Sequence, residues 1–162
     1  MHAWPDIQIL ILIIAANAAP ILACRLSGNR CAAPIDRGYL LDNGQPLFGA
    51  SKTWRGLIAG LIFPAMLAPL IGLDIVIGTI TGLLAMSGDL LASFSKRRLG
   101  MASESRATGL DQLPESLLPA MATSLWLPMN WLDIATVVAA FTTLEMLTSP
   151  LLYRMGIRKH PY

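Results

Sequence analysis

The sequence predicts an all-α, polytopic membrane protein with about five transmembrane helices, its N-terminus outside and its C-terminus inside. Of its 162 residues, 54% are hydrophobic and only 14% are charged, whereas a soluble domain carries about 25% charged residues. Five apolar stretches approach the ~20 residues that cross a bilayer as a helix. The length suggests a single domain, residues 1–162. The five stretches are Ile7–Cys24, Leu57–Leu73, Ile75–Phe94, Ser116–Leu132 and Ile134–Tyr153.

The distribution of the 12 Lys and Arg residues predicts the orientation. All of them lie between the first two stretches, between the third and the fourth, or in the tail after the fifth. Five spans bring these three regions to one side, which the positive-inside rule assigns to the cytoplasmic face of the cell membrane. We expect four of them to be plain anchors at the membrane surface: Arg25, Arg154, Arg158 and Lys159.

The first stretch is predicted to be a membrane helix rather than a signal peptide. A signal peptide carries basic residues before its apolar core, but here Asp6 precedes the stretch and Arg25 follows it. Asn17 and Pro20 interrupt the stretch. Polar groups within a bilayer usually face the bundle interior, and for Asn17 a structural and a functional role are equally open.

The later stretches contain small and polar residues that bear on helix packing. Gly56-x-x-x-Gly60 and Gly78-x-x-x-Gly82 permit two helices to approach closely, although such pairs are also frequent by chance. Glu145 lies midway along the fifth stretch, and we expect it to have a structural role.

The long inner loops are the segments in which we expect a ligand-binding or catalytic site. The outer connections at 72–74 and 130–133 are tight hairpins, whereas the inner loops hold about 30 and 20 residues and most of the polar side chains. A site is therefore expected where the inner loops meet the helix ends. The loops have too few aromatic residues to suggest a nucleic-acid partner.

One candidate segment leads into the second stretch. Gly49 lets backbone N–H groups approach a ligand closely, while Lys52 and Arg55 supply positive charge and Thr53 a hydroxyl. The N-terminus of the following helix also favours an anion, so the combination suits a phosphate. The spacing excludes a Walker A loop. A basic anchor at the headgroup level is an equally good interpretation of this segment alone.

A second candidate is the inner end of the third stretch. Asp89 lies a turn or more inside the apolar run, where a carboxylate costs roughly 2.5–3.5 kcal/mol at mid-membrane. At 100° per residue, Asp89, Ser93 and Lys96 share one helix face, with Arg97 nearby. This face could hold a divalent cation and the phosphates it neutralises. The structural alternative is an Asp89–Lys96 ion pair.

The third candidate opens the fourth stretch. Asp111 could cap a helix or provide a second carboxylate to a metal site, because it and Asp89 flank the same inner loop. Pro114 is well placed for a first helical turn, where acids such as Glu115 are also favoured.

Together these segments resemble the CDP-archaeol synthase family, a branch of the membrane CDP-lipid synthases related to the phosphatidate cytidylyltransferases. The matching segments follow the family order over almost the whole chain. They are Ala16–Pro20, Pro34–Asp36, Gly49–Gly56, Gly88–Arg98 and Leu110–Gln112.

The resemblance implies an activity and a set of site residues. Such enzymes transfer the cytidylyl group of CTP to a membrane lipid phosphate, of archaeol or phosphatidic-acid type, and release pyrophosphate with the help of Mg²⁺. Asp89 and Asp111 would be metal ligands and, with Lys96, the catalytic set. The implied substrate-binding residues are Asn17, Asp36, Lys52, Thr53, Arg55, Ser93, Arg97, Arg98 and Gln112.

The chain departs from the family pattern at one position. The resemblance implies an acid three residues after Asp111, where this chain has Pro114 followed by Glu115. Two alternatives stay open beside the enzyme. One is a small transporter or channel subunit with a polar path through Asn17, Asp89 and Glu145, and the other is a non-catalytic protein that binds anionic lipid. A homodimer is also left open.

Overall fold

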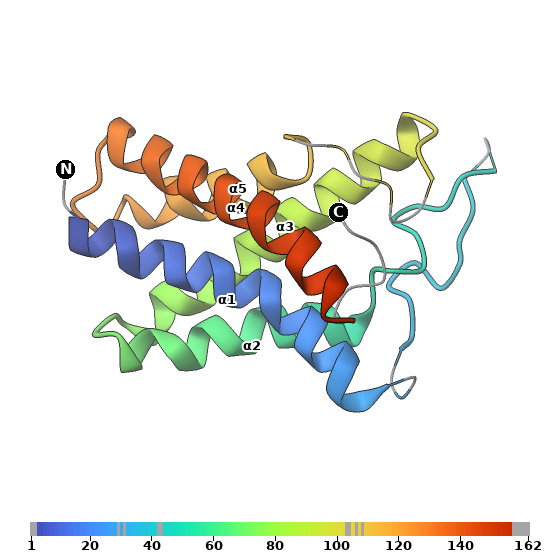
Figure 1. Ribbon diagram of the computed structural model, residues 1–162, viewed down its shortest axis with the longest axis horizontal. Coiled ribbons are helices and arrows are strands. Elements are labelled where there is room, and N and C mark those ends of the chain that lie inside the picture. The colour runs from blue at the N-terminus through green and yellow to red at the C-terminus, as the bar shows by residue number, and fades with distance from the viewer. Residues whose placement is uncertain are drawn as a thin grey trace.

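The described part of the chain contains five helices joined by loops, in agreement with the predicted all-α class (Figure 1). The computed structural model describes residues 3–28, 30, 32–41, 44–102, 105, 107 and 109–156. Among these residues there is no strand, only two isolated bridges within the loop before the second helix. The helices are α1 (Ala3–Ser27), α2 (Trp54–Leu70), α3 (Ile75–Arg98), α4 (Gln112–Thr123) and α5 (Trp131–Arg154).

Three of the five helices, α1, α3 and α5, are long and apolar enough to cross a membrane. Helix α2 has 17 residues and α4 only 12. At 1.5 Å per residue α4 is about 18 Å long, less than the ~30 Å hydrocarbon core. The predicted fourth span, Ser116–Leu132, is therefore wrong in extent. The helix starts earlier and stops at Thr123, and turns continue to Pro128, which disfavours helix in the residue before it.

Polar side chains define where α2, α3 and α5 begin. The side chains of Thr53, Asp74 and Asn130 accept hydrogen bonds from backbone N–H groups in the first turns of these helices. Asn130 and Asp133 cap each other's backbone reciprocally. Such caps satisfy N–H groups that have no partner within the helix.

Helix α1 is a central element of the bundle. It contacts all four other helices. Its residues Ile9, Leu12 and Ile13 are fully buried in a core that includes Val137 and Phe141 of α5. Burial of these aliphatic side chains holds α1 and α5 together on one side, while α3 packs between α2 and α4.

Glycines allow α2 and α3 to pack with their backbones in near contact. A Cβ atom on Gly82 would lie 2.7 Å from the carbonyl oxygen of Gly60, and one on Gly78 would lie 2.7 Å from the Cβ of Ala68. Both separations are closer than real Cβ contacts. The small-residue pairs are thus packing features here, not chance.

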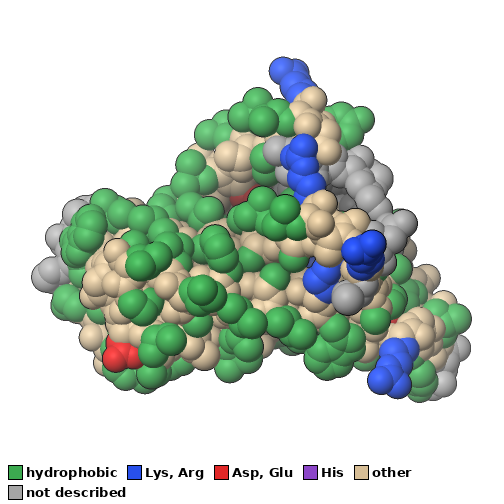
Figure 2. Space-filling view, turned by 90° about the horizontal axis from the view of Figure 1, so that it is seen from below, with side chains coloured by type: hydrophobic (Ala, Val, Ile, Leu, Met, Phe, Trp, Pro, Cys, Tyr) green, Lys and Arg blue, Asp and Glu red, His purple; other side chains and the backbone are tan. Residues whose placement is uncertain are grey.

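The surface separates apolar and basic regions along the long axis. Hydrophobic side chains cover most of the face in Figure 2, and Lys and Arg side chains gather toward one end. The inner loops and the ends of α1 and α3 lie at that end in Figure 1. Arg106, Arg158 and Lys159 fall outside the described residues.

Candidate active site

A cavity of about 790 Å³ opens at the basic end of the bundle. All five helices contribute to its wall: the C-terminal parts of α1, α3 and α5, and the N-terminal parts of α2 and α4. Because these helices alternate in direction, their contributing parts all lie at the same end. All twelve predicted site residues line this cavity except Asp36 and Arg98.

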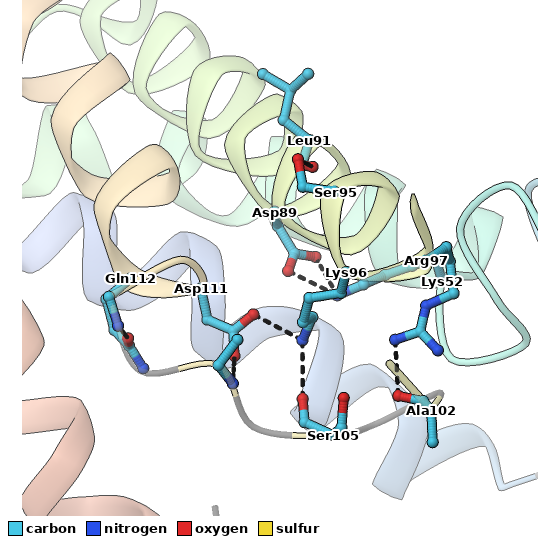
Figure 3. A network of polar contacts seen from close by, with 12 residues as sticks. Lys52, Asp89, Leu91, Ser95, Lys96, Arg97, Ala102, Ser105, Asp111 and Gln112 are labelled. Atoms are coloured by element: carbon cyan, nitrogen blue, oxygen red, sulfur yellow. Dashed lines mark hydrogen bonds and ion pairs between the residues drawn. The ribbon is translucent and has the colours of Figure 1, made fainter. Parts of the chain in front are cut away.

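Lys52 and Asp89 form one ion pair in the cavity (Figure 3). The Nζ atom of Lys52 lies 2.6 Å from each carboxylate oxygen of Asp89. Lys52 comes from the loop before α2, whereas Asp89 comes from the middle of α3. This pair provides the partner that a carboxylate inside an apolar helix needs.

The charge state of Lys52 follows from this contact. Burial lowers the pKa of the lysine, but the nearby carboxylate of Asp89, with Glu115 and Asp111 further off, raises it. The net effect is a pKa above the ordinary value of 10.5, so Lys52 is a fixed positive charge at neutral pH.

Lys96 and Asp111 form another ion pair, with 2.6 Å between Nζ and Oδ1. Lys96 also donates to the carbonyl oxygen of Ser105 at 3.0 Å. Asp111 stands at the N-cap position of α4, yet its side chain does not cap that helix. It accepts instead from the backbone N–H of Ala107 at 3.0 Å. The Asp89–Lys96 pair considered from the sequence is therefore not formed, because each residue has a different partner.

Ser93, Arg97 and Gln112 complete the buried polar wall. All three are less than a tenth exposed. The guanidinium group of Arg97 donates to the carbonyl oxygen of Ala102 at 2.7 Å, and Gln112 accepts from the backbone N–H of Gly109 at 2.8 Å. These contacts fold the inner loop between α3 and α4 against the cavity.

Asn17, Thr53 and Arg55 line the cavity but also have structural contacts. Asn17 donates to the carbonyl oxygen of Ile13, and Thr53 caps α2 by accepting from the backbone N–H of Gly56. The Arg55 guanidinium donates to the hydroxyl of Ser27 and to two carbonyl oxygens just after α1, at 2.8 to 2.9 Å. Arg55 thereby ties the end of α1 to the start of α2.

Asp36 organises the loop that carries Lys52 and does not line the cavity. Its carboxylate accepts from the backbone N–H groups of Gly38, Phe48 and Gly49, at 2.9 to 3.0 Å. Gly49 has a φ of +97°, a conformation that side chains disfavour. Burial raises the pKa of Asp36, but the three backbone hydrogen bonds outweigh it and hold the pKa below 3.8.

Arg98 likewise lies away from the cavity wall. It donates to the carbonyl oxygen of Pro46 at 2.9 Å, and its guanidinium carbon stands 5.2 Å from the ring centre of Phe94. Asp36 and Arg98 therefore contact the loop before α2 and support the site from behind, and their role in substrate binding stays a prediction.

Three residues line the cavity although the sequence predicts other roles for them. Glu115 is only 6% exposed and lines the cavity from α4, one position beyond the acid that the resemblance implies. Glu145 lines it from α5, and Arg25, expected to be a plain anchor, lines it from α1. The intramembrane position of Glu145 was the one sequence signal that could have identified it.

Comparison with known proteins identifies the family. The model of the CarS-like CDP-archaeol synthase family matches residues 6–162. The chain belongs to the CDP-archaeol synthase family. Its members are CTP-dependent cytidylyltransferases, so the chain is an enzyme of that class embedded in a membrane.

Relatives of this family match the chain over nearly its whole length. CDP-archaeol synthase from Sulfurisphaera tokodaii is 32% identical, covering 93% of this chain and 90% of its own. The Methanopyrus kandleri enzyme is 31% identical, covering 99% and 96%. The solved structure of an intramembrane enzyme for archaeal membrane lipid biosynthesis matches with a TM-score of 0.74 and 31% identity, covering 88% of this chain and 90% of that one.

Proposed function

We propose that this member of the CDP-archaeol synthase family transfers the cytidylyl group of CTP to an archaeol-type lipid phosphate at the cavity. The observation that carries the proposal is the pair of Lys–Asp contacts, Lys52–Asp89 and Lys96–Asp111, within one cavity at the end of an apolar bundle. A soluble nucleotide and a membrane lipid can both reach such a place. The names of the relatives support an archaeol-type lipid.

The proposed reaction needs no side-chain nucleophile. An oxygen of the lipid phosphate attacks the α-phosphorus of CTP, forming a new P–O bond, and the bond between the α- and β-phosphates breaks to release pyrophosphate. A lipid phosphate is already ionised at neutral pH, so no base is required to activate it. Catalysis is then positioning and neutralisation of charge.

The carboxylates in the cavity fit a divalent cation such as Mg²⁺. Among the described residues, no three acidic, His or Cys side chains are grouped closely enough to form a metal cage. Mg²⁺, however, is typically held by one or two carboxylates together with substrate phosphates. Asp89 and Asp111 would supply those carboxylates. The ion would neutralise charge on the phosphates of CTP and of the leaving pyrophosphate.

The basic residues of the wall would hold the phosphates. Lys96 and Arg97 line the cavity from the last turn of α3, and Lys52 lines it from the loop before α2. Arg55 and Asn17 contribute from the α1–α2 side. We further propose a single domain over residues 1–162, because all five helices line this cavity. The protein would lie in the cell membrane with the cavity on its cytoplasmic side.

Pyrophosphate release tests the proposal. Full-length protein in detergent with CTP and Mg²⁺ should release pyrophosphate with an ether-linked archaeol-type phosphate, and more slowly with an ester-linked phosphatidic acid. Asp89→Asn should reduce the rate by about 10²-fold or more, as expected for loss of a charge-stabilising group. Arg154→Met, which removes a surface charge outside the cavity, should leave the rate unchanged.

Two outcomes would contradict this proposal. An unchanged rate in Asp89→Asn would remove Asp89 from the mechanism. No pyrophosphate with any lipid, while anionic lipid still binds, would support the non-catalytic alternative. The transporter alternative has no support from the cavity, whose lining residues all lie at one end of the bundle.

A further inference from the structure

Lysines bind both carboxylates that the proposed reaction assigns to the metal ion. Lys52 contacts both oxygens of Asp89, and Lys96 contacts one oxygen of Asp111 (Figure 3). The other oxygen of Asp111 accepts a hydrogen bond from the backbone N–H of Ala107. The carboxyl oxygens that a cation would need therefore already have partners.

Lys52 occupies the position between the two oxygens of Asp89, so a divalent cation competes with it there and is repelled by it at either oxygen. Mg²⁺ binds carboxylate oxygens at 2.0–2.1 Å, and an ammonium group 2.6 Å from both oxygens would lie against the ion. The two positive charges repel strongly in a partly buried site. The side chains of Lys52 and Asp89 are only 22% and 29% exposed, so water screens this repulsion incompletely.

The same cavity offers the displaced lysines somewhere to go. Both are flexible side chains whose ammonium groups pair readily with phosphate oxygens. A bare cation displaces a lysine and leaves it without a counterion, whereas a cation that arrives with nucleotide phosphates supplies one. The aspartates then pair with the cation and the lysines pair with the phosphates, so no charged group is left without a counterion.

We propose that Lys52 and Lys96 are exchange residues, which neutralise Asp89 and Asp111 before substrate binds and move to the phosphates as the cation–nucleotide complex enters. This inference rests on the proposed function. It makes the enzyme selective for the cation–nucleotide complex over the cation alone, because only the complex provides new partners for the lysines.

Cation binding without nucleotide tests the exchange. The probe is Mn²⁺ alone, titrated into the full-length protein in detergent and measured by loss of the free Mn²⁺ signal in electron paramagnetic resonance. Lys52→Met keeps the length of the side chain but removes its charge, so it should bind Mn²⁺ at least about tenfold more tightly than wild type, since the repulsion is gone. Lys52→Arg keeps the charge and should bind as weakly as wild type.

Three further variants make the result specific. Arg154→Met removes one positive charge outside the cavity and should bind Mn²⁺ as wild type does. Adding Asp89→Asn to Lys52→Met should abolish the gain, which locates the cation at that carboxylate. Lys96→Met should show a gain of the same kind through Asp111, and it decides the question if Lys52→Met does not elute as a folded protein.

The outcomes are separable from those of the activity assay. Mn²⁺ binding by Lys52→Met and Lys96→Met that is no tighter than by Arg154→Met overturns the exchange, even if wild type releases pyrophosphate. A gain in Mn²⁺ affinity without any pyrophosphate release by wild type supports the exchange and contradicts the proposed reaction. A gain in Lys52→Arg equal to that in Lys52→Met also overturns it, because charge would then not be the cause.

Discussion

At the scale of single residues, the site depends on side chains that do not reach the cavity. Asp36 is buried, and its carboxylate accepts hydrogen bonds from three backbone N–H groups. Two of these belong to Phe48 and Gly49, just before Lys52. Hydrogen bonds to a charged acceptor contribute about 1.5–3 kcal/mol each. Asp36 therefore sets the shape of the loop from which Lys52 extends to Asp89.

Replacing Asp36 with Asn should destabilise the protein and also weaken catalysis. The amide keeps one oxygen acceptor but loses the charge and one acceptor group, for an expected cost of about 1–3 kcal/mol. Thermal unfolding and pyrophosphate release measure the two effects. Asp74→Asn is the matched control, because Asn also caps helices well and Asp74 lies at the opposite end of α3.

The effect of Asp36 should depend on pH. Because its folded-state pKa lies below 3.8, the carboxylate adds stability that is fully present above its unfolded-state pKa of about 3.9. That stability is lost as pH falls through the folded-state value. The difference in unfolding temperature between wild type and Asp36→Asn should be constant from about pH 8 to 5 and shrink below about pH 4. A difference that grows on acidification would contradict the assignment.

At the scale of elements, the contact between α3 and α4 brings the acids together. Gly88 lies against the first turn of α4, where a Cβ atom would meet Pro114 and stand 2.6 Å from the backbone nitrogen of Glu115. The neighbouring residue on α3 is Asp89. Close approach at Gly88 therefore determines how near Asp89 lies to Asp111 and Glu115.

Gly88→Ala should push α4 away from α3. Overpacking of a close contact costs about 1–3 kcal/mol, and the displaced acids should lower pyrophosphate release more than the loss of stability explains at a temperature where both proteins are folded. Ser87→Ala is the control, because Ser87 is a half-buried neighbour on the same helix turn whose hydroxyl donates only to the carbonyl oxygen of Leu83 within α3. Full activity in Gly88→Ala would show that this spacing does not matter to the reaction.

At the scale of the whole molecule, the charged groups and the cavity lie at one end of an apolar bundle. Alternating helix directions bring α1, α3 and α5 to that end by their C-termini, and α2 and α4 by their N-termini. Asp74 and Asn130 cap α3 and α5 at the other end, close to short connections. The positive-inside rule predicts that the cavity end is cytoplasmic.

Cysteine labelling tests this orientation on the two ends of α3. In a background with Cys24 and Cys31 replaced by Ser, Ile75→Cys and Leu99→Cys each provide one exposed thiol. A membrane-impermeant maleimide should label Ile75→Cys in intact cells and Leu99→Cys only after permeabilisation. The cysteine-free parent should remain unlabelled in both. Labelling of Leu99→Cys, but not of Ile75→Cys, in intact cells would contradict this orientation and place the cavity on the outer side of the membrane.

Local patterns were enough to predict much of this molecule. Apolar length located α1, α2, α3 and α5, and the glycine pairs anticipated the close packing of α2 on α3. The helical period correctly grouped Asp89, Ser93 and Lys96 on one face. The prediction of the fourth span was wrong in extent. Its apolar stretch contains the end of a helix, turns and Pro128, which hydrophobicity alone does not separate.

The sequence by itself determined the class of protein, the family, and the end of the bundle that carries the charge, because length, apolar content and charge position act locally along the chain. Only the tertiary structure decided which lysine meets which aspartate, and that Glu115, Glu145 and Arg25 line the cavity while Asp36 and Arg98 support it from behind. The Lys52–Asp89 pair joins residues 37 positions apart, and the contact of Arg98 with Pro46 joins residues 52 positions apart. They depend on how closely the helices pack and where each loop returns, which no local pattern specifies.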